Sequence, residues 1–314
     1  MKRLLLIDGS YYAYRSFHAI RELSNSRGEP TNAIFGFAKA VRKMLKDLRP
    51  DLAACVWDQG LPARRTELQP AYKAHRAEMP DLMRPQLPLI RDLVPKMGIA
   101  NVSLPNTEAD DLMASYTCAA HRHGGIQSIL ATNDKDLLSL VEDDILVYSN
   151  AKADLASPEQ TYALLGPAQI REKWGVSEPA RILDILALSG DASDGIPGVP
   201  GIGPKTATSL VLAGGTLDQL FADLAGLVKN EKTRAKLADA RAQVFQNREM
   251  VRLDTDLPLP QAVEALTIQP DYPAVIAALE NLEFRGLLAE YRAEAKAHEA
   301  GQSPSEAQEE LFPF

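Results

Sequence analysis

Three short apolar segments of this chain each end at an aspartate. Asp8 follows the apolar residues 4–7, Asp58 follows residues 53–57, and Asp134 and Asp136 follow residues 129–131. Between the first two segments, residues 31–48 carry apolar side chains at helical spacing. Strands that alternate with helices predict a mostly parallel, doubly wound α/β sheet, in which the carboxyl ends of the strands share one edge. We therefore expect these aspartates to lie close together.

A fourth acidic segment is the most concentrated. Glu108, Asp110 and Asp111 place three carboxylates within four residues, and an apolar helical run follows to about residue 123. One interpretation is an ordinary helix start, with Thr107 as the cap and early acids that suit the helix dipole. The strand-end aspartates favour a second interpretation, in which all these acids together bind a metal ion. Two like charges about 4 Å apart repel by roughly 4 kcal/mol at an effective dielectric near 20, so such a cluster needs a cation. Oxygen ligands alone favour Mg²⁺ or Mn²⁺ over zinc.

The composition is that of an ordinary globular protein. The 314 residues are 46% hydrophobic and 24% charged, and no apolar run is long enough to span a bilayer. Cys55 and Cys118 do not have metal-ligand spacing, which predicts free thiols in a reducing cytoplasm. No Ser/His/Asp or Cys/His grouping is visible, and His121 and His123 are expected to be solvated. The formal net charge of −8 on its face argues against a nucleic-acid partner.

A basic segment covers residues 60–88. Its cations and aromatic ring include Arg64, Arg65, Tyr72, Lys73, His75, Arg76 and Arg84. The segment is too long and too basic for a plain connection within a compact domain. Two interpretations stay open. It is either a solvated surface segment, or a mobile arch whose cations bind backbone phosphates while Tyr72 stacks on an unpaired base.

The second half of the chain is predicted to be helical from about residue 182. Within it, Gly198, Gly201 and Gly203 punctuate a short turn between two helices. Glycines allow close backbone approach, and the amides after Gly201 open a helix that can bind an anion, with Lys205 adding charge. A tight interhelical turn is the alternative, and phosphate binding is favoured. We expect an α/β core at 1–178, a helical region at 179–292 and a disordered tail at 293–314.

These motifs together identify a family. In order along the chain they are Asp8-Gly9 with Tyr14-Arg15, Arg27-Gly28-Glu29-Pro30, Phe35-Gly36-Phe37-Ala38, Tyr72-Lys73-Ala74-His75-Arg76, Glu108-Ala109-Asp110-Asp111, Asp134-Lys135-Asp136-Leu137, and Gly190-Asp191-Ala192-Ser193-Asp194 with the glycine hairpin. The chain resembles the 5′-nuclease domain at the amino end of bacterial DNA polymerase I, of the flap endonuclease family. The resemblance implies a PIN-like nuclease core followed by a helix-hairpin-helix. Two departures stand out: Gly195 replaces the usual asparagine, and the sequence contains no polymerase. The chain is either a free-standing nuclease or a piece of a longer protein, and the distinct tail favours the free-standing interpretation.

The resemblance also implies the site residues. Nine carboxylates would hold two or more divalent ions: Asp8, Asp58, Glu108, Asp110, Asp111, Asp134, Asp136, Asp191 and Asp194. The implied DNA contacts are Tyr14, Arg15, Arg65, Tyr72, Lys73, Arg76, Gly198, Gly201, Gly203, Lys205 and Thr206. Of these, Lys73 and Arg76 would also act on the scissile phosphate, and K⁺ would bind carbonyls of the hairpin. Without the nine acids the formal charge would be +1, so the charge balance does not exclude DNA.

The expected function is a two-metal-ion hydrolysis of DNA phosphodiester bonds at 5′ flaps and 5′ ends, in replication and repair. The enzyme would be a monomer in the bacterial cytoplasm, near the nucleoid, and would not read base sequence. A PIN-type ribonuclease is one alternative, although the arch and hairpin count against it. A non-catalytic branched-DNA-binding protein is another, although none of the nine acids is missing. Gln308, Leu311 and Phe312 also resemble the peptide that docks into the bacterial sliding clamp.

Overall fold

The computed structural model describes residues 1–157 and 159–300. The strands are β1 Lys2–Asp8, β2 Leu52–Trp57, β3 Ala100–Ser103, β4 Ile126–Ala131, β5 Ile145–Ser149, β6 Ala163–Leu165, β7 Gly190–Asp191 and β8 Ile196–Pro197. The helices are α1 Gly9–Ala19, α2 Asn32–Leu48, α3 Ala63–Leu68, α4 Gln86–Lys96, α5 Ala109–His123, α6 Pro167–Trp174, α7 Arg181–Ser189, α8 Pro204–Gly214, α9 Leu217–Ala222, α10 Leu224–Leu227, α11 Glu231–Asp239, α12 Arg241–Val251, α13 Tyr272–Asn281 and α14 Arg285–Glu299. Short 3₁₀ helices cover Asp136–Leu140, Lys152–Asp154 and Val263–Ala265.

The predicted α/β class is confirmed by a six-stranded sheet of order β3-β2-β1-β4-β5-β6. Strand β1 runs parallel to β4, with Lys2 opposite Ile126, and β4 runs parallel to β5. The edge strand β6 is antiparallel to β5. Four consecutive apolar residues of β1, from Leu4 to Ile7, are fully buried, as expected for a strand covered on both faces.

The chain forms two compact units. The first unit contains residues 1–8, 56–78 and 103–263, and the second contains residues 9–55, 79–102 and the chain from 264. The first unit continues past the helical region to residue 263, because the segment after α12 returns to α5. There the Asp254 amide donates to Asp111 Oδ1 (2.9 Å) and Ser115 Oγ donates to the Asp254 carbonyl (2.9 Å). All nine candidate carboxylates therefore belong to the first unit.

The predicted glycine turn joins α7 to α8 in the first unit. The chain leaves α7, forms the two-stranded β7–β8 pair and enters α8 after Gly203. Ile185, Leu188 and Val199 are among the buried side chains that form the core beneath it. A Cβ on Gly198 would lie 2.0 Å from the Ser189 carbonyl oxygen, so only glycine fits there. The hairpin and β7, which carries Asp191, are thus built as one piece.

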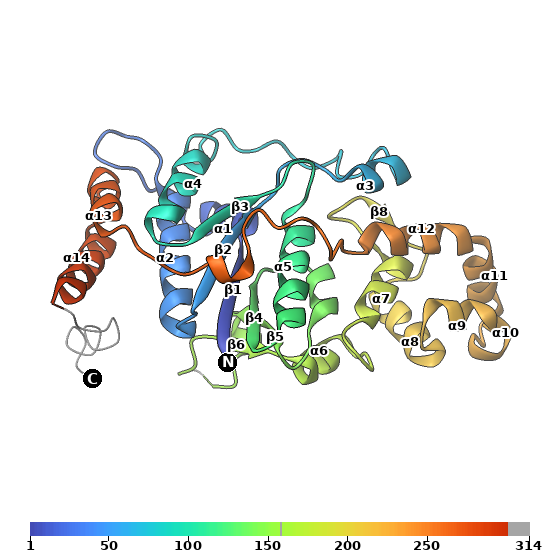
Figure 1. Ribbon diagram of the computed structural model, residues 1–314. Helices are drawn as coiled ribbons and strands as arrows, with labels where there is room; N and C mark the ends of the chain where they lie inside the picture. Colours follow the sequence, from blue (N-terminus) through green and yellow to red (C-terminus); the bar gives the residue numbers. More distant parts are fainter. Residues whose placement is uncertain (158, 301–314) are drawn as a thin grey trace. The chain divides into compact units, whose positions relative to one another are not determined.

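The second unit contains α1, α2, α4, α13 and α14 (Figure 1). Its start was not anticipated: α1 begins directly after β1, at Gly9-Ser10, in a sequence rich in aromatic residues that are weak helix formers. Its end also differs from the expected tail at 293–314, because α14 continues to Glu299. Glu294 is 7% exposed and pairs with Arg42 of α2. This residue, which was expected to lie in a disordered tail, is therefore buried.

Two further expectations concern the composition. Cys55 and Cys118 are both free thiols, as expected. Within residues 1–157 and 159–300, none of the helices is both long enough and apolar enough to cross a membrane.

Candidate metal centre

The carboxyl ends of β1 and β4 hold three aspartates in one hydrogen-bonded chain. Because the two strands are parallel and in register, Asp8 lies beside Thr132, whose hydroxyl donates to Asp8 Oδ2 (3.1 Å). The Asp134 amide in turn donates to the Thr132 hydroxyl (3.1 Å), and the Asp136 amide donates to Asp134 Oδ1 (2.9 Å). The expectation that aspartates at the carboxyl ends of parallel strands lie close together is therefore met for these three acids.

The start of α5 supplies the buried part of the cluster. Glu108, Asp110 and Asp111 are 2%, 8% and 1% exposed, and each offers a carboxylate oxygen within 4.8 Å of the others. Asp58, after β2, accepts a hydrogen bond from the Ala109 amide (2.9 Å) and so links the second strand end to this helix.

Helix capping does not explain these acids. The Thr107 hydroxyl donates to the Pro105 carbonyl (3.2 Å) rather than capping α5, and Glu108, at the N-cap position, makes no side-chain capping bond. Asp58 instead accepts the first helical amide from a separate strand. Among the described residues, Asp110 Oδ1 accepts only the amide of its neighbour Asp111 (2.7 Å), whereas the Glu108 and Asp111 carboxylates face the cations around them.

Arg65 is the principal internal counter-ion. Its side chain is 1% exposed and forks onto Asp111, with Nη1 to Oδ2 at 2.8 Å and Nη2 to Oδ1 at 2.9 Å. Nη1 also bonds Glu108, and Nε donates to the Met250 carbonyl (2.9 Å). Burial opposes the charged guanidinium, but Asp110 and Asp111 outweigh it and raise the pKa of Arg65. We expected a surface cation for phosphate here, and the structure instead places Arg65 inside the acid cluster.

Tyr72 and Lys73 also point into the cluster. The Tyr72 hydroxyl lies 3.1 Å from Glu108 Oε2 and 3.1 Å from Asp194 Oδ2. Lys73 Nζ bonds Glu108 and lies 3.4 Å from Asp194 Oδ2. The Tyr72 ring is only 3% exposed, so in this conformation it is a buried donor and not a platform for a base. Burial, together with Glu108 and Asp194, raises the pKa of Tyr72 and keeps the phenol protonated.

Arg76 is the exposed cation of the cluster. Its Nη2 lies 2.9 Å from Asp194 Oδ1, while about half of its side chain remains accessible to solvent. Burial opposes the charge of both Arg76 and Lys73, yet nearby Asp194 and Glu108 outweigh it and raise both pKa values. Three cations of the basic segment, Arg65, Lys73 and Arg76, thus point toward the candidate carboxylates. Arg64 instead contacts Asp254.

The last two acids come from the β7–β8 pair and its turn. Asp191 Oδ1 accepts the Ser193 amide (2.8 Å) and Oδ2 accepts Lys135 Nζ (2.9 Å). Burial acts to raise the pKa of Asp191, but the hydrogen bonds from Ser193 and Lys135 outweigh it and lower the pKa. Sequence patterns alone did not point to Asp191 and Asp194, because a two-residue strand between helices has no apolar run to mark it.

The structure explains why position 195 is a glycine. Its φ is +73°, and a Cβ at this position would lie 2.9 Å from the His75 ring. His75 is itself held by the Ala192 carbonyl (3.0 Å from Nε2). Glycine therefore suits both the left-handed backbone and the adjacent imidazole.

The cluster carries more negative charge than its side-chain cations balance. The pKa values of Asp110 and Asp136 are well above the ordinary range, first because both are buried and then because Asp111 and Asp134 lie beside them. Burial also raises the pKa values of Asp111 and Asp134. A partly buried, all-oxygen donor set of this kind fits hard divalent cations, which would relieve that repulsion.

A second group of ligand-type side chains lies at the other end of α5. His121, Glu142 and Asp144 offer atoms within 4.8 Å of one another. His121 Nδ1 lies 2.9 Å from Asp144 Oδ2, and the imidazole is about half exposed, in keeping with the expected solvated histidine. Within the described residues this group is separate from the acid cluster.

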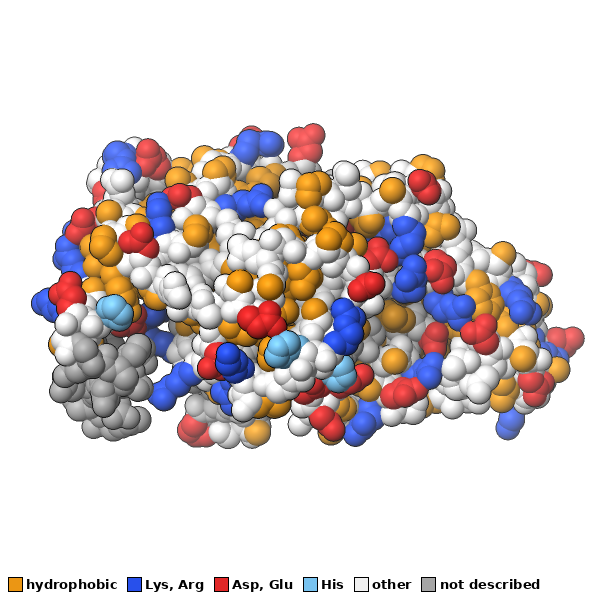
Figure 2. Space-filling view, in the orientation of Figure 1, with side chains coloured by type: hydrophobic (Ala, Val, Ile, Leu, Met, Phe, Trp, Pro, Cys, Tyr) orange, Lys and Arg blue, Asp and Glu red, His pale blue; other side chains and the backbone are white. Residues whose placement is uncertain are grey.

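The remaining predicted residues fall in three places. Gly201, Gly203, Lys205 and Thr206 are exposed around the start of α8, whereas Tyr14 and Arg15 lie on α1 of the second unit. Gln308, Leu311 and Phe312 lie outside the described residues. On the face shown in Figure 2, acidic and basic side chains are interspersed, so the net charge of −8 does not appear there as one acidic surface.

Two sequence families match the chain. The family described as "5′-3′ exonuclease, N-terminal resolvase-like domain" matches residues 3–175, and "5′-3′ exonuclease, C-terminal SAM fold" matches residues 177–274. A 5′-3′ exonuclease of Aquifex aeolicus is 34% identical over 291 residues, covering 92% of this chain and 95% of that protein. The thermostable DNA polymerase I of Thermus thermophilus is 39% identical over 307 residues. That match covers 97% of this chain but 35% of the polymerase, so the chain spans about a third of such relatives.

Solved structures share the fold. Bacteriophage T5 5′-exonuclease with bound divalent zinc ions superposes with a TM-score of 0.64 at 21% identity, covering 81% of this chain and 90% of that one. The T5 flap endonuclease in a pseudo-enzyme-product complex with DNA and metal ions has a TM-score of 0.64 at 20% identity, with coverage of 92% and 99%.

Proposed function

Because this chain belongs to the 5′-3′ exonuclease family, we propose that it hydrolyses DNA phosphodiester bonds at 5′ ends and at 5′ flaps. The observation that carries the proposal is the acid cluster itself. Carboxylates from three strand ends, one helix start and the β7–β8 turn converge within one unit, and cations line their edge. Grouping buried carboxylates in this way costs folding free energy, so the arrangement would be strongly unfavourable in a protein that does not use a charged site.

The acids divide into two sets of metal ligands. Asp8, Glu108, Asp110 and Asp111 are the proposed set for one divalent ion, with Asp58 at its edge. Asp134, Asp136, Asp191 and Asp194 are the proposed set for a second ion on the DNA side. Mg²⁺ or Mn²⁺ held there would supply the positive charge that activates water and stabilises the leaving 3′ oxygen.

The cations of the cluster act on the phosphate. Lys73 and Arg76 reach the edge of the acid cluster and would neutralise charge that develops on the scissile phosphate. Tyr72 stays a neutral hydrogen-bond donor to Glu108 and Asp194 and so orients two proposed ligands. Arg65 holds Asp111 from the protein side and acts as a positioning residue.

Substrate binding is proposed to depend on backbone phosphates and strand ends. The exposed amides around Gly201 and Gly203, with Lys205 and Thr206, would grip duplex phosphates, with K⁺ on nearby carbonyls. Tyr14 and Arg15 of α1 are further proposed DNA contacts. The protein would act as a monomer in the bacterial cytoplasm, close to the nucleoid, without reading base sequence.

The experiment is a cleavage comparison with a matched acid control. Wild type, Asp110→Asn and Asp143→Asn, an exposed acid outside the cluster, are given a 3′-labelled 5′-flap duplex and single-stranded RNA with Mg²⁺ or EDTA. We expect one DNA product at the flap junction for wild type and Asp143→Asn, and none with EDTA or with Asp110→Asn. Preferred RNA cleavage would favour the ribonuclease alternative, and tight DNA binding without cleavage would favour a branched-DNA-binding protein.

The clamp contact is proposed separately. Gln308, Leu311 and Phe312 match the spacing of a sliding-clamp peptide. Capture by an immobilised bacterial clamp should be lost when Leu311 and Phe312 are both replaced by alanine. Capture that survives this double replacement would disprove the assignment.

A further inference from the structure

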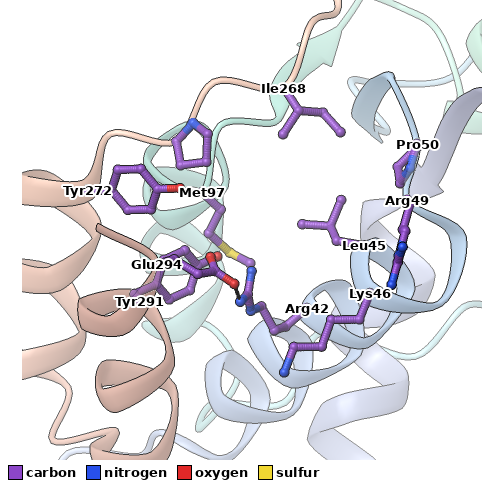
Figure 3. A pocket seen from close by; sticks show the side chains of 11 residues that line it. Arg42, Leu45, Lys46, Arg49, Pro50, Met97, Ile268, Tyr272, Tyr291 and Glu294 are labelled. Carbon is purple, nitrogen blue, oxygen red and sulfur yellow. Dashed lines mark hydrogen bonds and ion pairs between the residues drawn. The ribbon is translucent and has the colours of Figure 1, made fainter. Parts of the chain in front are cut away.

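The second unit contains a cavity of about 390 Å³, and none of the nine candidate carboxylates lines it. It lies between the last turns of α2, the end of α4, the loop 268–270 and the helices α13 and α14 (Figure 3). Its apolar lining comes from Leu45, Pro50, Met97 and Ile268. The volume is within the range of pockets that bind small molecules or peptide side chains.

One buried polar group on the cavity wall lacks a hydrogen bond of normal geometry to the part of the chain that the structure describes. Tyr291 of α14 is 1% exposed, and its hydroxyl has no hydrogen-bond partner of normal geometry among the described residues. The Arg42 guanidinium lies over the Tyr291 ring, 4.7 Å from its centroid. A buried hydroxyl without a hydrogen bond is destabilising, so an occupant that offers an oxygen would stabilise this wall.

The charged residues of the cavity are unevenly balanced. Arg42 pairs with Glu294, and Lys46 Nζ lies 2.8 Å from Glu290. Arg49 follows the last residue of α2, is exposed, and has no ion-pair partner within the described part of the chain. Figure 3 shows Arg42, Lys46 and Arg49 along one side of the cavity. The rim is therefore net cationic above an apolar interior.

We propose that this cavity binds the C-terminal segment 306–314 of the same chain. The segment carries Glu306, Glu309 and Glu310 and then Leu311, Phe312 and Phe314. Its acids complement the cationic rim, its apolar side chains complement the interior, and a glutamate oxygen can accept from Tyr291. The occupant thus matches each of the three features of the cavity.

The chain that follows α14 is long enough to bring the segment 306–314 back to the cavity. Glu294 lines the cavity and α14 ends five residues later, at Glu299, about 8 Å further along the helix. The twelve residues from Ala300 to Leu311 span at most about 40 Å, which is ample for the return. A segment tethered at this distance has a millimolar effective concentration, so even weak contacts would keep the site filled. A peptide held in this way would not be free for a second partner.

The test uses the full chain with p-benzoylphenylalanine in place of Phe312. After irradiation, mass spectrometry should find crosslinks within one chain to residues 42–50, to Met97 or to residues 268–272. Crosslinks elsewhere in the chain, or none, would overturn the proposal. A crosslinked product of twice the chain mass would also overturn it, because the occupant would then be a second copy.

Exchanging the charges of residues 49 and 310 distinguishes a loss of docking from general damage to the fold. Arg49→Glu should lower the crosslink yield about tenfold, and adding Glu310→Arg should restore it. Arg285→Glu, an exposed cation outside the cavity, is the matched control and should leave the yield unchanged. Equal yields for Arg49→Glu and Arg285→Glu would mean that the cationic rim does not hold the segment. Arg49, Arg285 and Glu310 do not belong to the acid cluster, so flap cleavage should persist in the charge variants.

Discussion

Replacing Arg65 by methionine should destabilise the protein more than any other single loss of an arginine charge near the acid cluster. The change keeps most of the side-chain volume but leaves Asp111, 1% exposed, without its internal cation and Glu108, 2% exposed, with Lys73 alone. Removing one partner of a buried ion pair typically costs about 3–5 kcal/mol. For a domain of 150–250 residues, each kcal/mol lowers Tm by about 2–4 °C, so we expect a decrease of about 6–20 °C.

The assay is thermal unfolding in EDTA and again in Mg²⁺. Because a divalent ion beside Glu108 would replace part of the lost positive charge, the Arg65→Met variant should lose less stability in Mg²⁺ than in EDTA. Arg292→Met is the control: this arginine pairs with Glu280 on the surface, with about half of each side chain exposed, and should cost less than about 1 kcal/mol. A loss for Arg65→Met no larger than that of the control would refute the counter-ion assignment.

Three further predictions address the cations, the metal and the DNA contact. Lys73→Met should lower kcat for flap cleavage by about 10²–10³ in single-turnover assays with little change in KM, and an unchanged kcat would mean that Lys73 is only structural. Burial raises the pKa values of Asp110 and Asp136, so the folded metal-free protein binds more protons than the unfolded chain and gains stability as pH falls through the raised pKa values. Mg²⁺ should therefore raise Tm more at pH 8 than at pH 5.5, and equal shifts would contradict this. Lys205→Ala should reduce the salt dependence of duplex binding by about one unit of slope while cleavage of bound DNA continues, whereas an unaltered slope would remove Lys205 from the interface.

Much of the site was predictable because strand ends have a sequence signature. An apolar run followed by an aspartate marks the edge of a parallel sheet, and Asp8 and Asp134 do meet there through Thr132. The cluster at Glu108, Asp110 and Asp111 was predictable for a similar reason, since three acids at a helix start exceed what capping requires.

Other features depend on contacts that no local pattern encodes. Arg64 and Arg65 are adjacent arginines in the sequence, yet only Arg65 enters the acid cluster. Its Nε donates a hydrogen bond to the carbonyl of Met250, which is 185 residues away in the chain. Glu294 looked like part of a polar tail, but its pairing with Arg42, 252 residues away, makes it a buried side chain. Such long-range partners decide burial, and periodicity does not report them.

The most direct test of the two-ion cluster is a crystal structure with Mn²⁺, recorded at a wavelength where manganese scatters anomalously. We predict two anomalous peaks about 4 Å apart, one beside Glu108 and Asp110 and one beside Asp134 and Asp191. The Asp110→Asn crystal should lose or weaken the first peak and retain the second. An acid cluster without a peak, or a single peak at His121 and Asp144, would contradict the central claim that these carboxylates form a two-metal nuclease site.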